Sequence, residues 1–404
     1  MIAPKIAHLT SNHKPFDNRI FKQCRSIAAS GYDVTLIVPT DLDRIIDAVR
    51  IKAVPRPKSR RSRMLRTVWQ IYRDALGEDA DIYHFHDPEL IPAGLLLRAR
   101  GKRVVIDLHE NVPNQILYKD WIPGTFRKAL GAVYERCERA IAGCWSAMVT
   151  ANEDISVRFY DVSSRVTAVH NYSDLNEFPA KVSFELERYS SGTILHCGGI
   201  SSRTSIHAVL AATELVSLLN PKLIITGVVE SNELFQHATQ NPGWRFVDWK
   251  GMIPRRDMID VLKLASLALV LYGPADNHLS IRSNRFFEAM AAGLPLIAPD
   301  YPDWKQTVED IGCGVVVNPK DPEAIARAMT FLITNPKEAS AMGRRGRHAV
   351  LSKFNWTSEL PKLLRVYEEV LNKPASARSA FPRNRSELTM ARASLGTGKF
   401  EKPD

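Results

Sequence analysis

Apolar and polar residues alternate along most of the chain in a way that predicts strands and helices in turn. Near the N-terminus the apolar stretch 5–10 is followed by an amphipathic segment at 17–30 and by the wholly apolar stretch 33–39. The outer stretches predict strands, and the middle segment, with apolar residues at helical spacing, predicts a helix. Such a β-α-β unit has parallel strands joined by a right-handed crossover.

The same alternation continues to residue 150 and then, after a break, starts again. Residues 178–192 have little periodicity and end in Ser-Ser-Gly, which indicates a domain junction. Further strands are predicted at 82–85, 103–108, 147–150, 193–197, 222–226, 245–247, 267–271, 294–298 and 314–317. Further helices are predicted near 62–76, 89–98, 125–143, 206–219, 254–265, 284–292, 322–334 and 359–371.

Continuously apolar strands that alternate with helices predict parallel sheets covered on both faces. The fold class is therefore α/β, with two Rossmann-like, doubly wound domains facing each other across a cleft. We expect an N-terminal domain at 1–178, a linker at 179–192 and a C-terminal domain at 193–373, whose final helix is a candidate to pack back on the first domain. Residues 374–404, rich in Ser, Ala, Arg and Pro, predict a disordered basic tail.

The composition narrows the class of protein. A length of 404 residues favours two domains. No apolar run approaches the roughly 18 residues of a membrane span, and the first residues lack a signal-peptide pattern. The five cysteines form no CxxC pair, which argues against a zinc site and a disulfide framework. A cytoplasmic location is therefore expected.

The net charge of +10 has a local concentration in the first half. Residues 58–76 combine a cluster of basic side chains with Trp69 and Tyr72 in an amphipathic helix. Such a helix can lie on an anionic membrane surface, so the protein could be peripheral at the inner face of the plasma membrane. An ordinary solvated helix face explains the pattern equally well. Nucleic acid is not an expected partner, because no nucleic-acid-binding motif is present.

The stretch 283–300 contains one carboxylate, Glu288, in an otherwise apolar part of a predicted helix that Gly293 ends. A carboxylate in such a place costs free energy unless something pairs with it. It could be a surface glutamate. Alternatively, Glu288 accepts hydrogen bonds from the hydroxyls of a ligand, while the helix N-terminus faces the phosphate of that ligand.

Three loops of the second domain follow strand ends and could complete such a site. In the first, the backbone amides of Gly198 and Gly199 could approach a phosphate, although a glycine pair is more often a tight turn. In the second, 249–254, the backbone could form a rim for a nucleotide base, or it is an ordinary connection. The third loop leads into the stretch 283–300. Three cations near the third loop and the first could bind a diphosphate: Arg203, Arg282 and Arg285.

The first domain has histidines and acids at two neighbouring strand ends, 84–89 and 107–111. A histidine at a strand end is usually a structural hydrogen-bonding group. Two such clusters aimed at one cleft favour a functional role. Histidines and carboxylates are also metal ligands, but neither stretch has a paired-histidine spacing such as HExxH, so we expect no metal.

Taken together and in order, these stretches resemble the retaining family 4 glycosyltransferases of the two-Rossmann (GT-B) fold, in particular the bacterial polysaccharide branch. The resemblance extends from residue 5 to about 371. The matching stretches are His13 with FDNRIF, GYDV, DIYHFHDPEL, DLHEN, HCGGI, WKGMIP, SNRFFEAMAAGLPLIAPD, CGVVVNPKDPEAIA and FNW.

The resemblance implies roles for particular residues. Glu288 would bind the nucleotide ribose, and the loop of Gly198 and Gly199 the diphosphate. His109, with Glu110 beside it, would take the catalytic position near the donor sugar. The resemblance also implies nucleotide or diphosphate contacts at Arg203, Gly251, Ile253, Arg282, Asn284, Arg285 and Phe286, and acceptor contacts at His13, Asp17 and His86.

The chain departs from the family pattern at the donor sugar. Ser280 stands where the family has a second glutamate, and Asp276 is the nearest acid that could replace it. The basic residues that the family has in the diphosphate loop would fall on Gly199 and Thr204, which are not basic.

The resemblance implies transfer of a sugar from a nucleotide diphosphate sugar to an acceptor hydroxyl, with retention of configuration. It implies no cofactor and no metal, and a lipid-linked or glycan acceptor. Two alternatives remain: a catalytically inactive relative that serves as a binding or scaffold partner in polysaccharide assembly, and a nucleotide-sugar epimerase of the same fold.

Overall fold

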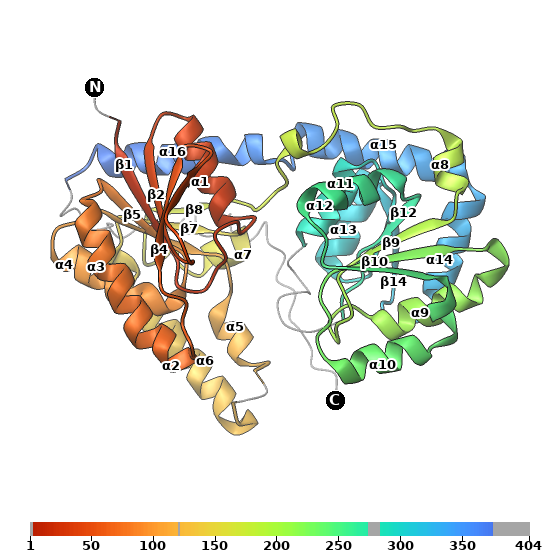
Figure 1. Ribbon diagram of the computed structural model, residues 1–404, viewed down its shortest axis with the longest axis horizontal. Coiled ribbons are helices and arrows are strands. Elements are labelled where there is room, and N and C mark those ends of the chain that lie inside the picture. Colours follow the sequence, from red (N-terminus) through yellow and green to blue (C-terminus); the bar gives the residue numbers. More distant parts are fainter. Residues whose placement is uncertain (1–2, 120–121, 274–282, 375–404) are drawn as a thin grey trace. The chain divides into compact units, whose positions relative to one another are not determined.

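The computed structural model describes residues 3–119, 122–273 and 283–374, and the chain divides into two compact units (Figure 1). The first unit contains the chain up to Asn171 and the chain from Glu359 onward, and the second contains Tyr172–Ser358. The division thus falls between Asn171 and Tyr172. The last helix belongs, from Glu359, to the first unit. The expected tail lies outside the described residues except for its first residue.

The first unit is built on an eight-stranded sheet with the order β3-β4-β2-β1-β5-β6-β7-β8. All its neighbouring strands are parallel except the hairpin of β3 and β4. The strands are β1 (Lys5–Leu9), β2 (Asp33–Pro39), β3 (Arg44–Ile46), β4 (Val49–Val54), β5 (Ile82–Phe85), β6 (Val104–Leu108), β7 (Ala147–Thr150) and β8 (Val166–Ala168).

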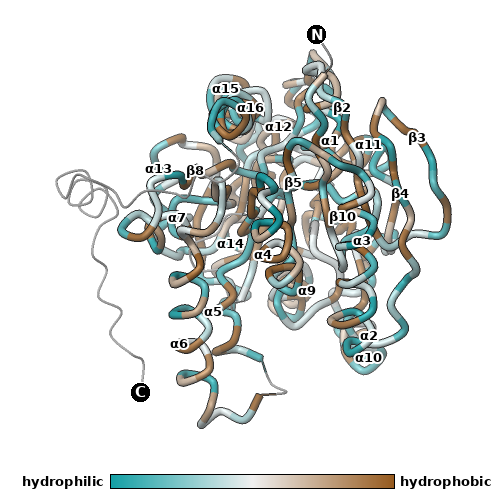
Figure 2. Tube along the Cα trace, turned by 90° about the vertical axis from the view of Figure 1, so that its left-hand side faces the viewer, coloured by the Kyte–Doolittle hydropathy of each residue, from teal (hydrophilic) through white to brown (hydrophobic). Residues whose placement is uncertain are grey.

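Helices cover both faces of this sheet. The longer ones are α1 (Ile20–Ala29), α3 (Val68–Glu78), α4 (Ile91–Ala99), α6 (Gly124–Ile141) and α16 (Trp356–Leu371). The short elements are α2 (Arg60–Ser62), the π-helical η1 (Arg63–Thr67), η2 (Pro88–Leu90), α5 (Val112–Ile116), η3 (Ala142–Cys144) and α7 (Glu153–Val157). Figures 1 and 2 both place α2, α5 and α6 at the same end of the unit.

The two faces of the first sheet differ in polarity. Ala7, Leu9, Tyr83 and Phe85 point into an apolar core that includes residues of α3 and α4. Because side chains alternate along a strand, the intervening positions point to the opposite face. Polar side chains lie there, on the strands or directly after them, and all are buried: His8, Thr10, His84, His86 and Asp107.

The second unit is built on a six-stranded parallel sheet with the order β11-β10-β9-β12-β13-β14. The strands are β9 (Thr193–Cys197), β10 (Lys222–Thr226), β11 (Val247–Gly251), β12 (Leu267–Leu269), β13 (Leu296–Pro299) and β14 (Gly314–Val317). The helices are η4 (Leu175–Glu177), α8 (Leu186–Ser190), α9 (Ile206–Leu215), η5 (Ser217–Leu219), α10 (Asn232–Gln240), η6 (Pro242–Phe246), α11 (Arg255–Leu264), α12 (Asn284–Ala291), α13 (Pro302–Ile311), α14 (Pro322–Thr334) and α15 (Pro336–Ser352).

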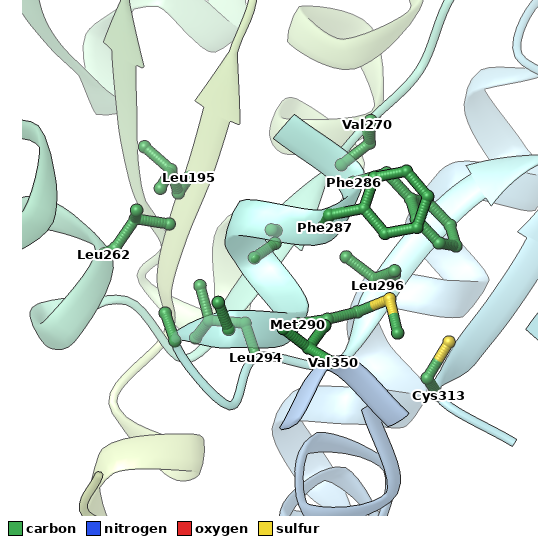
Figure 3. Close-up of a cluster of buried hydrophobic side chains, with 14 of the residues drawn as sticks. Leu195, Leu262, Val270, Phe286, Phe287, Met290, Leu294, Leu296, Cys313 and Val350 are labelled. Atoms are coloured by element: carbon green, nitrogen blue, oxygen red, sulfur yellow. The ribbon is translucent and has the colours of Figure 1, made fainter. Parts of the chain in front are cut away.

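Apolar residues fill both faces of the second sheet. One core lies beneath α11, α12 and α13, and the other lies beneath α9 and α14. Figure 3 shows the first of these, with Phe286, Phe287 and Met290 of α12 packed among strand residues. A fold of two Rossmann-like domains is thus confirmed, each with its own core.

Several boundaries differ from the sequence prediction. The strand predicted at 245–247 begins at Val247 and continues to Gly251, so much of the predicted loop 249–254 is strand β11. The helices α10, α13 and α15 and the strands β3 and β4 were not predicted. Strand β4, which lies between β3 and β2, alternates exposed Arg50 with buried Val49 and Ile51, so it lacks the continuous apolar run of the strands near the centre of the sheet.

Candidate functional site

Glu288 lies on helix α12, which follows strand β12 of the second sheet. The apolar side chains of this helix pack in the core, and Gly293, with φ of +72°, ends it in the left-handed conformation that favours glycine. Glu288 itself is only 7% exposed. The carboxylate is therefore not on the surface of the helix, and a buried charge of this kind needs a partner.

The partner of Glu288 is Arg255, the first residue of α11. Its Nη1 donates to Oε1 of Glu288 at 2.6 Å, while its Nε and Nη2 donate to Oε2 of Glu177 at 2.9 and 2.8 Å. Burial alone would lower the pKa of Arg255, but the two carboxylates outweigh it and raise that pKa. Among the described residues no hydrogen bond is recorded for Oε2 of Glu288, so this oxygen can accept one from a ligand. Arg255 was not predicted as a site residue, because nothing in the local sequence around Arg255 indicates a distant partner.

The N-terminus of α12 has no side-chain cap. Ser283 stands at the cap position without a capping hydrogen bond, and its Oγ is buried without a partner among the described residues. The first backbone N–H groups of a helix lack partners within the helix and favour an anion. Asn284 and Arg285 supply such N–H groups, and Nη1 of Arg285 lies 3.2 Å from the hydroxyl of Tyr272. This end of α12 is thus suited to a phosphate.

The glycine pair is explained by packing within the protein. The N–H groups of Gly198 and Gly199 both donate to the carbonyl of Thr226, at 3.2 and 2.8 Å. Gly199 has φ of +69°, and a Cβ there would lie 2.2 Å from the carbonyl oxygen of Val228. Both amides are therefore engaged, and a diphosphate at this loop would need other donors.

The other residues expected to contact the donor lie on several elements of the second unit. Gly251 ends β11 with φ of +62°, and its carbonyl accepts from the N–H of Gly227 at 2.8 Å. Ile253 is partly exposed and Arg203 is exposed. Phe286 is fully buried, so only its backbone could face a ligand. Asp276, Ser280 and Arg282 lie outside the described residues.

In the first unit, His13 lies between two carboxylates. Its Nδ1 is 3.3 Å from Oδ2 of Asp17 and its Nε2 is 3.3 Å from Oδ1 of Asp87. Burial opposes a charge on this ring, but the hydrogen bonds to Asp17 and Asp87 outweigh it and raise the pKa of His13 to about 10. His13 is therefore an imidazolium at neutral pH, and its ring centroid lies 5.1 Å from that of His109.

Asp87 organises the loop that carries His13. Its Oδ2 accepts from the hydroxyl of Thr10 at 2.7 Å and from the N–H of Ser11 at 2.6 Å. Burial opposes the charge of Asp87, but the hydrogen bond to His13 and the charge of that ring, together with the bonds from Thr10 and Ser11, lower the pKa of Asp87 to about 2. The sequence of the stretch 84–89 indicated Asp87 as a candidate site residue. It did not indicate Thr10, because the contact of Thr10 with Asp87 depends on strands β1 and β5 being neighbours.

His109 follows β6, beside a buried ion pair. Asp107, on β6, accepts from Nε and Nη2 of Arg19 at 2.9 and 2.6 Å and lies 3.1 Å from Nδ1 of His86. Nδ1 of His109 is buried without a hydrogen-bond partner among the described residues, and burial lowers the pKa of this ring. Glu110 is exposed. The stretch FDNRIF contains Arg19, but its pairing with Asp107 becomes visible only in three dimensions.

Two groups of side chains in the first unit are close enough to hold a metal ion. His8, His84 and His86 form one, and His86, Asp107 and His109 form the other; the potential ligand atoms within each group lie within 4.8 Å of one another. The carboxylate of Asp107 is already neutralised by Arg19, so neither group offers an uncompensated negative charge to a cation. The expectation of no metal stays a prediction.

Comparison with known families accounts for most of the chain. Residues 18–177 match the family model "Glycosyltransferase Family 4", and residues 184–349 match "Glycosyl transferases group 1". The chain belongs to the family 4 glycosyltransferases. The two models together cover the second sheet, the first sheet except β1, and the segments that carry His109 and Glu288.

Individual relatives of this glycosyltransferase are distant. Glycogen synthase of Mycobacterium tuberculosis is 22% identical over 293 residues, which is 71% of this chain and 68% of the relative. The GDP-mannose-dependent alpha-(1-6)-phosphatidylinositol monomannoside mannosyltransferase of Mycolicibacterium smegmatis is 35% identical over 95 residues, 24% of each chain. The fold is that of sucrose-phosphate synthase from Thermosynechococcus elongatus, with a TM-score of 0.72 and 17% identity over 91% of this chain and 99% of that one.

The family assignment confirms a glycosyltransferase of the GT-B fold. No helix within the described part of the chain is both long and apolar enough to cross a membrane.

Proposed function

We propose that this glycosyltransferase moves a sugar from a nucleotide diphosphate sugar to an acceptor hydroxyl with retention of configuration. The observation that carries the proposal is Glu288, a buried carboxylate with one oxygen on Arg255 and the other available to a ligand. A ribose offers two adjacent hydroxyls to such an acceptor. The mannosyltransferase relative is GDP-mannose-dependent, which agrees with a donor of this class.

The chemistry rests on charge stabilisation by the protein. The uncapped N-terminus of α12 and the side chain of Arg285 would stabilise the departing diphosphate, each nearby charge at the helix end contributing about 0.3–1 kcal/mol. We expect no metal and no cofactor. His109, whose pKa is lowered by burial, would be neutral and would position the sugar, while the leaving phosphate takes the acceptor proton.

For the acceptor we propose a lipid-linked or glycan hydroxyl, reached at an anionic membrane surface on the cytoplasmic side. Two helical segments support this. The segment α2–η1–α3 exposes Met64, Leu65 and Trp69 among arginines. Helix α6 exposes Phe126, Leu130 and Val133 at helical spacing, with Lys128 and Arg136 also exposed. Apolar residues flanked by cations are typical of helices that lie in a membrane interface.

A panel of nucleotide sugars, screened by thermal shift and then assayed with membrane lipid extracts, tests the proposal. A donor that stabilises the protein and yields an extended glycolipid or glycan, with the anomeric configuration of the donor, is the expected result. Binding without product for every donor and extract would indicate a scaffold protein instead. Conversion of the donor without any acceptor would indicate an epimerase.

A further inference from the structure

A row of buried polar side chains joins the last helix to the candidate site in the first unit. His8 lies on β1 beside His84 on β5, and His86 comes two residues after His84, directly after the end of β5. Asp107 lies on β6, and Tyr367 comes from α16. All five side chains belong to residues that are at most 2% exposed.

Each neighbour in this row is within hydrogen-bond distance of the next. Oδ2 of Asp107 is 3.1 Å from Nδ1 of His86, and Nε2 of His86 is 2.9 Å from Nδ1 of His8. The hydroxyl of Tyr367 is 3.2 Å from Nε2 of His8 and 2.6 Å from Nδ1 of His84. These distances form one unbranched chain from Asp107 to His84.

The direction of the hydrogen bonds in the chain follows from its two ends. The ion pair of Asp107 with Arg19 keeps this carboxylate ionised, so it can only accept, and Nδ1 of His86 must carry a proton. At the other end, Nε2 of His84 is buried without a hydrogen-bond partner among the described residues, so the proton of this ring belongs on Nδ1, which donates to the hydroxyl of Tyr367. That hydroxyl donates to Nε2 of His8, and Nδ1–H of His8 donates to Nε2 of His86. All three rings are therefore Nδ1–H tautomers.

The chain leaves no place for an additional positive charge. Burial and the neighbouring imidazoles hold the pKa values of His8 and His84 well below their usual range. The charged groups nearest to the row, Arg19 and Asp107, already neutralise each other. A metal ion among the three histidines would add two uncompensated charges to this interior, which is costly.

The row reaches the candidate site at two points. Asp107 precedes His109 by two residues on the same strand end, and His86 precedes Asp87, which holds the loop of His13. We propose, on the basis of the proposed function, that Tyr367 is a positioning residue: its hydroxyl closes a one-directional hydrogen-bond chain that fixes His86 and Asp107, and through them the His109 segment. One hydroxyl of the last helix would thus set the geometry of a site formed more than 250 residues earlier in the chain.

The wild-type protein tests the direction of the chain without any variant. In histidine-labelled protein, long-range ¹H–¹⁵N correlation spectra report which ring nitrogen carries the proton. We expect Nδ1–H for His8, His84 and His86, unchanged between pH 5.5 and 8. An Nε2–H form in any of the three, or one equivalent of a bound transition metal in the purified protein, would overturn the chain.

Replacing Tyr367 by Phe tests the positioning role. The ring stays and the hydroxyl is lost, so His86 should keep its tautomer through Asp107 and His8 should keep its own through His86. Only His84, whose Nδ1 bonds to the hydroxyl, should lose its fixed tautomer. The ring signals of His109 should shift, and kcat should fall by about 10- to 100-fold, with the KM for the donor unchanged. Tyr32→Phe is the matched control, because Tyr32 packs against Tyr367 at 6.1 Å between ring centroids but is not part of the chain.

Unchanged His109 signals and an unchanged kcat in folded Tyr367→Phe would refute the positioning role. If that variant does not fold, His84→Leu removes only the end of the chain, and His8 and His86 should keep their Nδ1–H tautomers in it. A protein without activity on any donor would contradict the proposed function, whereas the tautomers and the His109 signals would still decide on the hydrogen-bond chain.

Discussion

The carboxylate of Glu288 is held at 2.6 Å by Arg255, which fixes its charge and orientation before any ligand arrives. We expect Glu288→Gln to weaken nucleotide binding by about 1–3 kcal/mol, or roughly 5- to 150-fold, because an amide is a poorer acceptor for ribose hydroxyls. Isothermal titration calorimetry with a nucleoside diphosphate measures this.

Glu177→Gln is the matched control for Glu288. It makes the same chemical change on the other carboxylate bound to Arg255. We expect little change in nucleotide affinity for this variant. An equal loss in both variants would show that Arg255 and its network, and not the ribose contact, cause the effect.

The imidazolium of His13 gives the first unit a pH-dependent contribution to stability. Its pKa in the folded state is raised to about 10, whereas that of an unfolded histidine is about 6.5. The stabilisation is therefore complete below pH 6.5 and is lost as the pH rises toward 10. Because one pKa unit corresponds to about 1.4 kcal/mol, we expect His13 to lower the free energy of unfolding by several kcal/mol over this interval.

Denaturant unfolding of wild type and His13→Gln at several pH values between 6 and 10 isolates this contribution. The difference between the two proteins should be largest at pH 6 and small at pH 10, since other titrating groups affect both proteins alike. A difference that does not vary with pH would mean that His13 is neutral in the folded protein.

At the scale of elements, the N-terminus of α12 is the feature that a phosphate would use. Ser283→Asp places a carboxylate at the cap position. It should stabilise the helix by about 0.5–1 kcal/mol, since aspartate is a good cap and complements the helix dipole. The same charge should repel the diphosphate and weaken nucleoside diphosphate binding about tenfold, with nucleoside binding unchanged.

Ser231→Asp provides the comparison for this change. Ser231 caps α10, where its side chain accepts from the N–H of Leu234. A stable protein with normal diphosphate affinity is expected there. If Ser283→Asp also binds the diphosphate normally, the phosphate does not lie at the N-terminus of α12.

Most helices and strands were predicted from the sequence, because their apolar residues recur at a clear period. The strands at 33–39, 82–85 and 193–197 have the predicted bounds, as their buried residues are continuous. Helix α15 was missed because its sequence contains two glycines and several basic residues, and it forms by packing Gly343 and Gly346 closely against neighbouring elements. A close approach between distant segments leaves no periodic signal.

At the scale of the whole molecule, exposed apolar and basic side chains on α2–η1–α3 and α6 belong to the first unit. Figure 2 shows hydrophobic and hydrophilic positions interleaved along α6. We expect the protein to float with anionic liposomes at low salt and to detach at high salt, because the cations contribute about 1 kcal/mol each near the surface. Replacing Trp69 and Phe126 together by Glu should abolish flotation.

Leu218→Glu is the control for the membrane surface. Leu218 is 99% exposed, but it belongs to the second unit and to none of these helices. This variant should float as the wild type does. Flotation of the Trp69 and Phe126 double variant at wild-type levels would exclude these helices as the membrane contact.

The sequence by itself determined the two-domain α/β fold and the stretches that carry His109 and Glu288, because periodicity and motif spacing are local properties of the chain. The tertiary structure alone decided what those residues contact. Arg255 was brought to Glu288, Arg19 to Asp107 and Tyr367 to His8 by neighbouring strands and packed helices. A buried polar group must find a partner wherever the fold supplies one, and no local pattern records where that partner is.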